Sequence, residues 1–72
     1  MPLTMLSPGK EAVVGACRAK ETTRKFLEGL GIIPGVTISV ISQFNGNLIV
    51  SIKGSRLALN RGVAQQVLVQ VS

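Results

Sequence analysis

The sequence predicts a small, mainly β barrel of about five strands with one amphipathic helix inserted after the first strand. Three observations support this fold class: short alternating segments of Val, Ile and Leu, glycine-containing turn signals between them, and one segment with apolar residues at helical spacing. With 72 residues, 46% of them hydrophobic, the chain has room for a single domain spanning residues 1–72. Strands this short protect their edges by closing into a barrel.

The first strand is predicted at EAVVGAC, residues 11–17, after the turn signal Ser7-Pro8-Gly9. Gly15 indicates a bulge or bend in this strand. Cys17 ends it, and we interpret this lone cysteine as a small apolar residue, because the chain has no histidine or second cysteine to activate it. The residues predicted to share the inner face are Ala12, Val14 and Ala16.

From Lys20 the apolar period becomes helical, which predicts one amphipathic helix of about three turns. Phe26 is expected in the core, and Glu21 is expected to pair with Lys25 one turn later. The predicted inner face consists of Thr23, Phe26, Leu27 and Leu30, and the predicted outer face of Glu21, Arg24, Lys25 and Glu28.

The glycine-rich segment after the helix, GLGIIPG at residues 29–35, is predicted to be a corner and not a phosphate-binding loop. Gly31 follows the last periodic residue, where a left-handed cap favours glycine, and Pro34-Gly35 predicts a type II turn. The spacing GxGxxxG differs from the dinucleotide fingerprint, and the segment lies between a helix and a strand instead of between a strand and a helix.

The rest of the chain is predicted to form four strands joined by tight turns. Asn45-Gly46 predicts a hairpin, and Gly54-Ser55 predicts the next turn. A single helical turn is expected at RGVAQ, residues 61–65. The predicted inward residues of the four strands are Val36, Ile38 and Val40, then Leu48, Val50 and Ile52, then Leu57 and Leu59, and finally Val67, Val69 and Val71.

The run from Gly29 to Ile52 carries no charge and is long enough to cross a bilayer. We do not expect it to do so, because its proline, glycines and asparagines suit two strands and a turn, and a spanning helix has no water to satisfy a broken backbone. The N-terminus lacks the basic and apolar regions of a signal peptide, which makes the cytoplasm the expected location.

The formal net charge of +5 favours an acidic partner or surface. Single lysines usually only solvate a face, but the cations around the helix form a group that we identify as a candidate partner contact: Arg18, Lys20, Arg24 and Lys25. Three apolar residues fall on the outward faces of strands: Ile41, Ile49 and Leu68. Either they mark a protein contact, including weak homo-oligomerisation, or the helix covers them.

Enzymatic chemistry is not expected, because the three glutamates are scattered and no histidine is present to serve as a base. The same shortage of ligands argues against a metal site, and we expect no cofactor. Nucleic-acid binding is the alternative function, since basic small barrels often bind it. That surface would lack stacking rings, because the chain has only Phe26 and Phe44 as aromatics.

The order of several segments resembles the FeoA family. These segments are Leu3 and Leu6 before Pro8-Gly9, a basic helix carrying Arg24 and Leu27, LGIIPG at Leu30 to Gly35, and GSRLALNRGVAQQVLV at Gly54 to Val69. The resemblance covers nearly the whole chain and implies an SH3-like barrel without catalytic residues. It also implies an accessory role in ferrous iron uptake, through binding to the cytoplasmic region of a FeoB-like GTP-dependent transporter at the inner face of the membrane.

Overall fold

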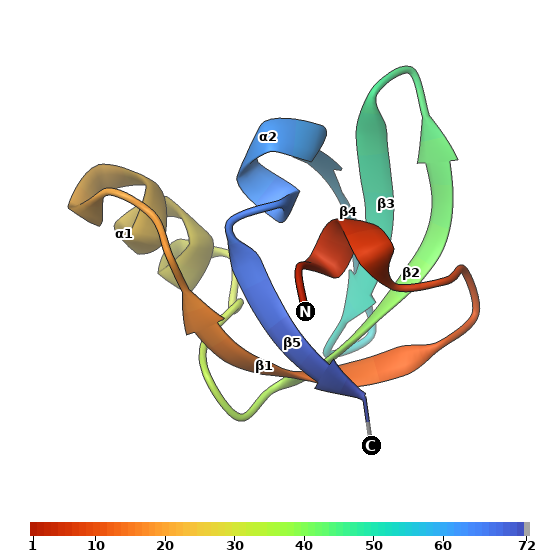
Figure 1. The fold of residues 1–72 in the computed structure, drawn as a ribbon, viewed down its shortest axis with the longest axis horizontal. Helices are drawn as coiled ribbons and strands as arrows, with labels where there is room; N and C mark the ends of the chain where they lie inside the picture. The colour runs from red at the N-terminus through yellow and green to blue at the C-terminus, as the bar shows by residue number, and fades with distance from the viewer. Residues whose placement is uncertain (72) are drawn as a thin grey trace.

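The computed structural model describes residues 1–71, in which one five-stranded antiparallel sheet curls around an aliphatic core (Figure 1). The strand order is β4-β3-β2-β1-β5, so the last strand returns to pair with the first. This confirms the mainly β fold class with a helix inserted after β1. The elements in chain order are η1 (Leu3–Met5), β1 (Glu11–Cys17), α1 (Glu21–Gly29), β2 (Thr37–Phe44), β3 (Asn47–Ile52), β4 (Ser55–Asn60), α2 (Arg61–Ala64) and β5 (Val67–Val71).

The N-terminal segment lies along the edge of β5 that does not face β1. The amino group of Met1 donates to Val69 O at 2.9 Å, and the Val69 N–H donates back to Met1 O at 2.7 Å. Pro2 continues this pairing through a bridge to Leu68. Leu3 is buried within η1, which also contacts α2. The N-terminal segment therefore covers one of the two edges of the sheet.

Strand β1 confirms the predicted bulge at Gly15. Its pairing with β5 shifts register between Val14 and Ala16, so Gly15 is the extra residue. A Cβ added at Gly15 would lie only 3.6 Å from Leu68 O, so β5 approaches this position closely. The predicted inward position of Ala16 is wrong, because the bulge turns its side chain outward. Cys17 packs against the core instead.

Helix α1 ends in a Schellman motif that confirms the predicted cap. The N–H of Gly31 donates to Glu28 O at 2.9 Å and the N–H of Ile32 donates to Leu27 O at 3.0 Å, with Gly31 at φ +90°. Leu27 and Ile32 are both fully buried, which supplies the apolar contact typical of this motif.

The expectation that Phe26 belongs to the core is wrong, since its side chain is 58% exposed. Helix α1 projects from the side of the barrel (Figure 1) and buries a single residue of its own, Leu27. Leu30 packs partly against the core, and Thr23 is only half-buried. The helix therefore packs against the barrel through its C-terminal end, and the ring of Phe26 lies outside this helix–barrel contact.

Both hairpin turns have two residues with positive φ, as type I′ turns require. Asn45 and Gly46 have φ values of 49° and 77°, which fits the predicted hairpin. The next turn is Lys53-Gly54, with φ values of 50° and 78°, and not Gly54-Ser55. The prediction was one residue late, because Ser55 already pairs with Ile52 as the first residue of β4.

The uncharged run from Gly29 to Ile52 is divided among the end of α1, a turn and the β2–β3 hairpin. The turn is the predicted one at Pro34-Gly35, with the Val36 N–H donating to Ile33 O at 3.2 Å and Gly35 at φ +92°. Within residues 1–71, no helix is long and apolar enough to cross a membrane.

The core is aliphatic, and no polar side chain is buried among the described residues. Alternation along the strands fills it as predicted, except at Ala16, described above, and at Val71. Val71 is 49% exposed although it shares a face with Val67 and Val69, because it lies at the rim of the barrel where β5 ends. The buried residues are Leu3, Leu6, Ala12, Val14, Leu27, Ile32, Ile38, Val40, Leu48, Val50, Ile52, Leu59, Ala64, Val67 and Val69.

Candidate functional site

The basic residues proposed as a partner contact are all exposed and surround α1. Arg18 and Lys20 lie in the connection from β1 to α1, and Arg24 and Lys25 lie on the helix. Two glutamates share the helix, and Glu21 pairs with Lys25 at 3.6 Å, as predicted. Because both partners are largely exposed, this pair adds little stability. The surface of α1 itself therefore carries two cations and two glutamates, and the excess of positive charge around it comes from Arg18 and Lys20.

The exposed ring of Phe26 lies on the same helix as Arg24 and Lys25. Aromatic and arginine side chains are the residue types that protein interfaces concentrate at their centres. The sequence pattern placed Phe26 inside, so it missed this part of the surface. The sequence feature that indicates the exposure of Phe26 is the length of the helix. A helix of nine residues that contacts the barrel only at one end buries little more than one turn.

The three outward apolar residues do not form one cluster. Ile41 is the extra residue of a second bulge, between Val40 and Ser42 of β2, and Ile49 lies beside it on β3. Leu68 lies on β5, which is separated from β3 by two strands, β2 and β1, and it is bridged to Pro2. All three are half-buried. Helix α1 does not cover Ile41 and Ile49, since it lies on the opposite side of the barrel from the β2–β3 hairpin (Figure 1).

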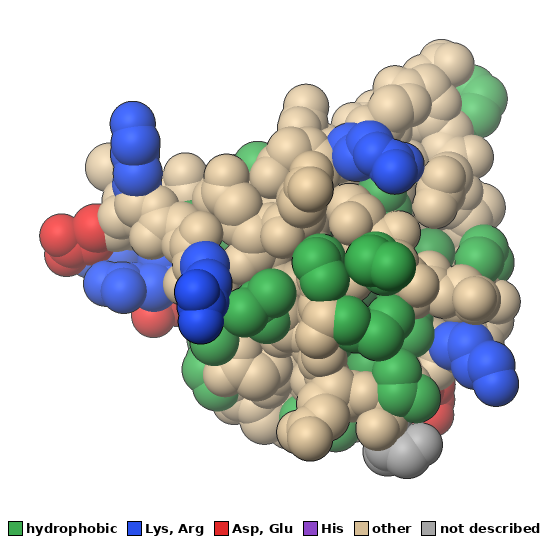
Figure 2. All heavy atoms as spheres, viewed as in Figure 1, with side chains coloured by type: hydrophobic (Ala, Val, Ile, Leu, Met, Phe, Trp, Pro, Cys, Tyr) green, Lys and Arg blue, Asp and Glu red, His purple; other side chains and the backbone are tan. Residues whose placement is uncertain are grey.

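A hydrophobic patch that the sequence analysis missed lies over η1 and β5 (Figure 2). Its exposed members are Met1, Met5 and Val71, and the half-buried Leu68 adjoins Pro2 within it. The signal in the sequence is the segment MPLTML, in which Leu3 and Leu6 turn inward and the two methionines turn outward. Leu68 thus belongs to a surface distinct from that of Ile41 and Ile49.

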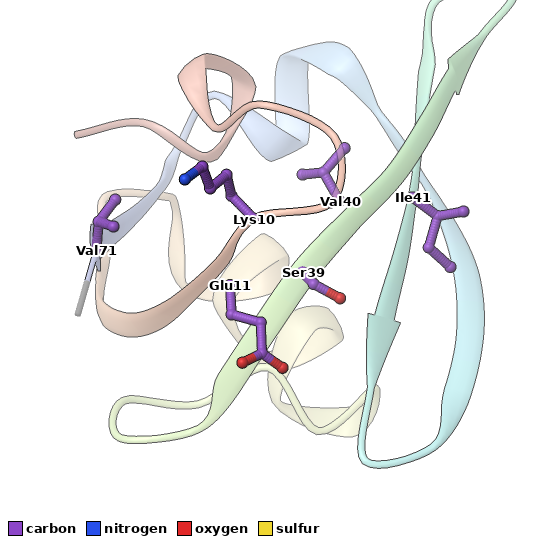
Figure 3. Close-up of a pocket in the computed structure, with 7 residues that line it drawn as sticks. Lys10, Glu11, Ser39, Val40, Ile41 and Val71 are labelled. Carbon is purple, nitrogen blue, oxygen red and sulfur yellow. The ribbon is translucent and has the colours of Figure 1, made fainter.

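An open groove of about 600 Å³ lies between the start of β1 and the middle of β2 (Figure 3). Its two charged side chains, Lys10 and Glu11, are exposed and point in different directions, so they do not converge on one ligand atom. Ser39 pairs with Glu11 across the two strands. The residues lining the groove are Gly9, Lys10, Glu11, Ser39, Val40, Ile41 and Val71.

The acidic residues are dispersed over two elements. Glu11 begins β1, whereas Glu21 and Glu28 lie at the two ends of α1. Among residues 1–71, no group of three or more His, Cys, Asp or Glu side chains is placed to hold a metal ion.

The two aromatic rings bear on the nucleic-acid alternative. Phe44, 66% exposed, is at the tip of the β2–β3 hairpin, and Phe26 is on α1, so they lie on opposite sides of the barrel (Figure 1). Proteins that stack bases place their rings along one groove. The two rings are therefore not arranged as a single base-stacking surface.

Cys17 is half-buried at the end of β1, beside α1. Burial raises the pKa of its thiol, Glu28 raises that pKa further, and Arg24 partly offsets both effects. We expect iodoacetamide at pH 8.5 to alkylate Cys17 more slowly in the folded protein than in the urea-unfolded chain, because the thiolate is the reacting form. Equal rates, measured by mass spectrometry, would contradict this.

The same shift predicts how stability depends on pH. The folded protein holds the thiol proton to a higher pH than the unfolded chain does, because its pKa is raised. The stabilising contribution of this group is therefore complete below the unfolded pKa and is lost as the pH rises through the folded pKa. The variant Cys17→Ala should lose this alkaline dependence in denaturant titrations.

Comparison with known proteins agrees with the fold and with the segment order. Residues 1–71 match the model of a family described as the FeoA domain. A curated relative from Methanocaldococcus jannaschii, which carries the name Fe(2+) transport protein A, is 35% identical over 69 residues that cover 96% of this chain and 84% of the relative.

Two solved structures are similar over almost the whole chain. The crystal structure of an iron uptake regulatory protein, FeoA, has a TM-score of 0.90 at 33% identity, covering 97% of this chain and 93% of that one. The solution structure of the FeoA protein from Chlorobium tepidum has a TM-score of 0.91 at 26% identity, covering 99% and 70%.

Proposed function

Because the chain belongs to the FeoA domain family, we propose that it is an accessory protein of ferrous iron transport that binds the cytoplasmic region of a FeoB-like transporter. The observation that carries this proposal is the family match, which extends over residues 1–71. In this role the protein is a binding module and not an enzyme, and it works at the inner face of the membrane through its partner.

Helix α1 is the surface that we assign to the transporter contact. It projects from the barrel, so it can reach a partner without rearrangement of the sheet (Figure 1). Its exposed ring, Phe26, offers a large apolar anchor, and Arg24 and Lys25 beside it attract an acidic surface. Arg18 and Lys20 extend the same charge toward β1.

The proposal is tested by titrating the purified cytoplasmic region of a FeoB-like transporter with this protein in a calorimeter. GTP hydrolysis by that region is then measured with and without the protein. Saturable binding and a changed hydrolysis rate support the proposal. Absence of binding at low salt, where attraction between charges is greatest, contradicts it.

A charge reversal on α1 tests the assigned surface. We expect Arg24→Glu to weaken transporter binding roughly tenfold at low salt, because it replaces an attraction with a repulsion, and to weaken it less at high salt. The matched control is Lys10→Glu, which changes the net charge by the same two units at an exposed position away from α1. Equal losses in both variants would indicate general attraction and would remove α1 from the proposal.

Weak self-association is a second property that the surface supports. The patch of Met1, Met5, Val71 and Leu68 is the apolar surface available for it (Figure 2). Sedimentation at increasing protein concentration tests this, with Met5→Gln as the variant that should abolish any dimer. A strict monomer at the highest concentration would contradict self-association.

A further inference from the structure

The two edge strands of the sheet, β5 and β4, are covered differently. The N-terminal segment pairs with β5 through Met1 and Pro2, as described above. Strand β4 pairs with β3 over its whole length, from Ser55 to Asn60. Within residues 1–71, no backbone hydrogen bond from outside the β3–β4 pair reaches Arg56 or Ala58. Strand β4 therefore has a free edge.

The turn before β4 determines which backbone groups face that edge. A two-residue hairpin turn is closed by a hydrogen-bonded pair, here Ile52 and Ser55, and such pairs alternate with non-hydrogen-bonded ones along the strands. Leu57 and Leu59 therefore bond to β3, and Arg56 and Ala58 direct their N–H and C=O groups away from the sheet. These outward-facing backbone groups provide two consecutive hydrogen-bonding sites for an added strand.

The side chains at this edge have a defined pattern. Ala58 is exposed and lies opposite Ile49, which in turn lies beside the bulge at Ile41. These residues form an apolar stripe that crosses β2 and β3 and ends at the free edge. Arg56 lies two positions from Ala58 and therefore on the same face.

The charges around β4 are all of one sign. Lys53 precedes the strand, Arg56 is on it and Arg61 follows it, and all three are exposed. None of the three glutamates lies on β3, β4 or α2, because Glu11 is on β1 and the other two are on α1. This edge is therefore more uniformly basic than α1, where two glutamates lie among the cations.

We propose that the free edge of β4 binds an extended acidic segment of a protein partner as an added antiparallel strand. The segment carries an apolar residue beside Ala58 and a carboxylate two positions away, beside Arg56. Backbone hydrogen bonds to Arg56 and Ala58 supply affinity, and the side chains supply selectivity. The inference rests on the proposed function only in taking a protein as the ligand, and it concerns a surface other than α1.

A second copy of this chain does not fit the edge as well. Two β4 strands side by side would bring Lys53, Arg56 and Arg61 of each copy together, and such repulsion is how edge strands avoid pairing with one another. The cations that repel a second copy attract an acidic segment.

The test is a titration of the isotope-labelled full chain with the blocked peptide ETITETE, followed by amide resonances. We expect the amides of Arg56 and Ala58 to shift most. N-methylation of the peptide isoleucine, which removes one donor and keeps every charge, should weaken binding about tenfold. The charge-reversed peptide KTITKTK should not bind. In the protein, Ala58→Pro should abolish binding, since proline removes the Ala58 donor and edge strands tolerate it.

Three results would overturn the proposal. The N-methylated peptide binding as well as its parent would reduce the effect to charge attraction. Shifts confined to α1 would move the site away from β4. Shifts of Arg56 and Ala58 on raising the protein concentration without peptide would make a second copy the occupant.

These outcomes are independent of the transporter assay. Peptide binding without transporter binding would leave the β4 site standing and remove the proposed function. Transporter binding that depends on Arg24, without peptide binding, would do the opposite.

Discussion

Replacing Leu27 by alanine should cost about 2–5 kcal/mol of the free energy of unfolding, because it opens a cavity where the side chain is 0% exposed. Leu27 is the one residue of α1 buried in the core, and its carbonyl accepts the Ile32 N–H of the helix cap. A small domain has only about 5–15 kcal/mol in total, so the loss is a large share of its stability.

The matched control is Phe26→Ala at the neighbouring position. Its ring is 58% exposed, so the free energy of unfolding should change by less than about 0.5 kcal/mol. Urea titrations followed by circular dichroism measure both variants, since the chain has no Trp or Tyr for fluorescence. A larger loss for Phe26→Ala than for Leu27→Ala would contradict the placement of the helix.

Two glycines at the end of α1 should respond to alanine with opposite signs. Gly31 has φ +90°, where an L residue is strained, and Gly31→Ala should cost about 1–2 kcal/mol. Gly29 is the last helical residue and has no such φ, so Gly29→Ala should stabilise the protein by about 0.4–1 kcal/mol.

Steric clashes do not contribute to this comparison, because a Cβ added at either glycine meets no atom within 4 Å. The difference between the two variants in thermal unfolding therefore reports backbone conformation alone. Destabilisation of equal size in both would mean that the left-handed cap is not what limits the Gly31 position.

Local chemistry explains why so much of the fold could be predicted from the sequence. Asn45-Gly46 and Pro34-Gly35 specify their own turns, and alternation in β2 and β3 specifies which side chains face the core. Gly31 specifies the helix cap because few residues other than glycine adopt its backbone angles.

Apart from the turn at Lys53-Gly54, which was predicted one residue late, the errors arose where distant segments decide the outcome. Ala16 follows a bulge whose position depends on the register with β5, and Val71 lies at the rim of the barrel, at the end of β5. Helical periodicity indicates that one face of α1 is apolar, but it does not reveal that only the C-terminal end of the helix meets the barrel. Phe26 was misplaced for that reason.

The candidate surfaces also differ in how far the sequence alone predicts them. Exposure of Arg24 and Lys25 followed from helical spacing alone. The free edge of β4 depends on the strand order, which short-range patterns do not contain. The cations Lys53, Arg56 and Arg61 were visible in the sequence, but only the sheet topology places them along one unpaired backbone.

The strand order also divides the folding reaction into local and long-range steps. Strands β2, β3 and β4 are joined by two tight turns, so their pairing closes only short loops. Strands β1 and β5 come from near opposite ends of the chain, and joining them carries the largest loss of chain entropy. We therefore expect the meander of β2, β3 and β4 to form first and the pairing of β1 with β5 to form last.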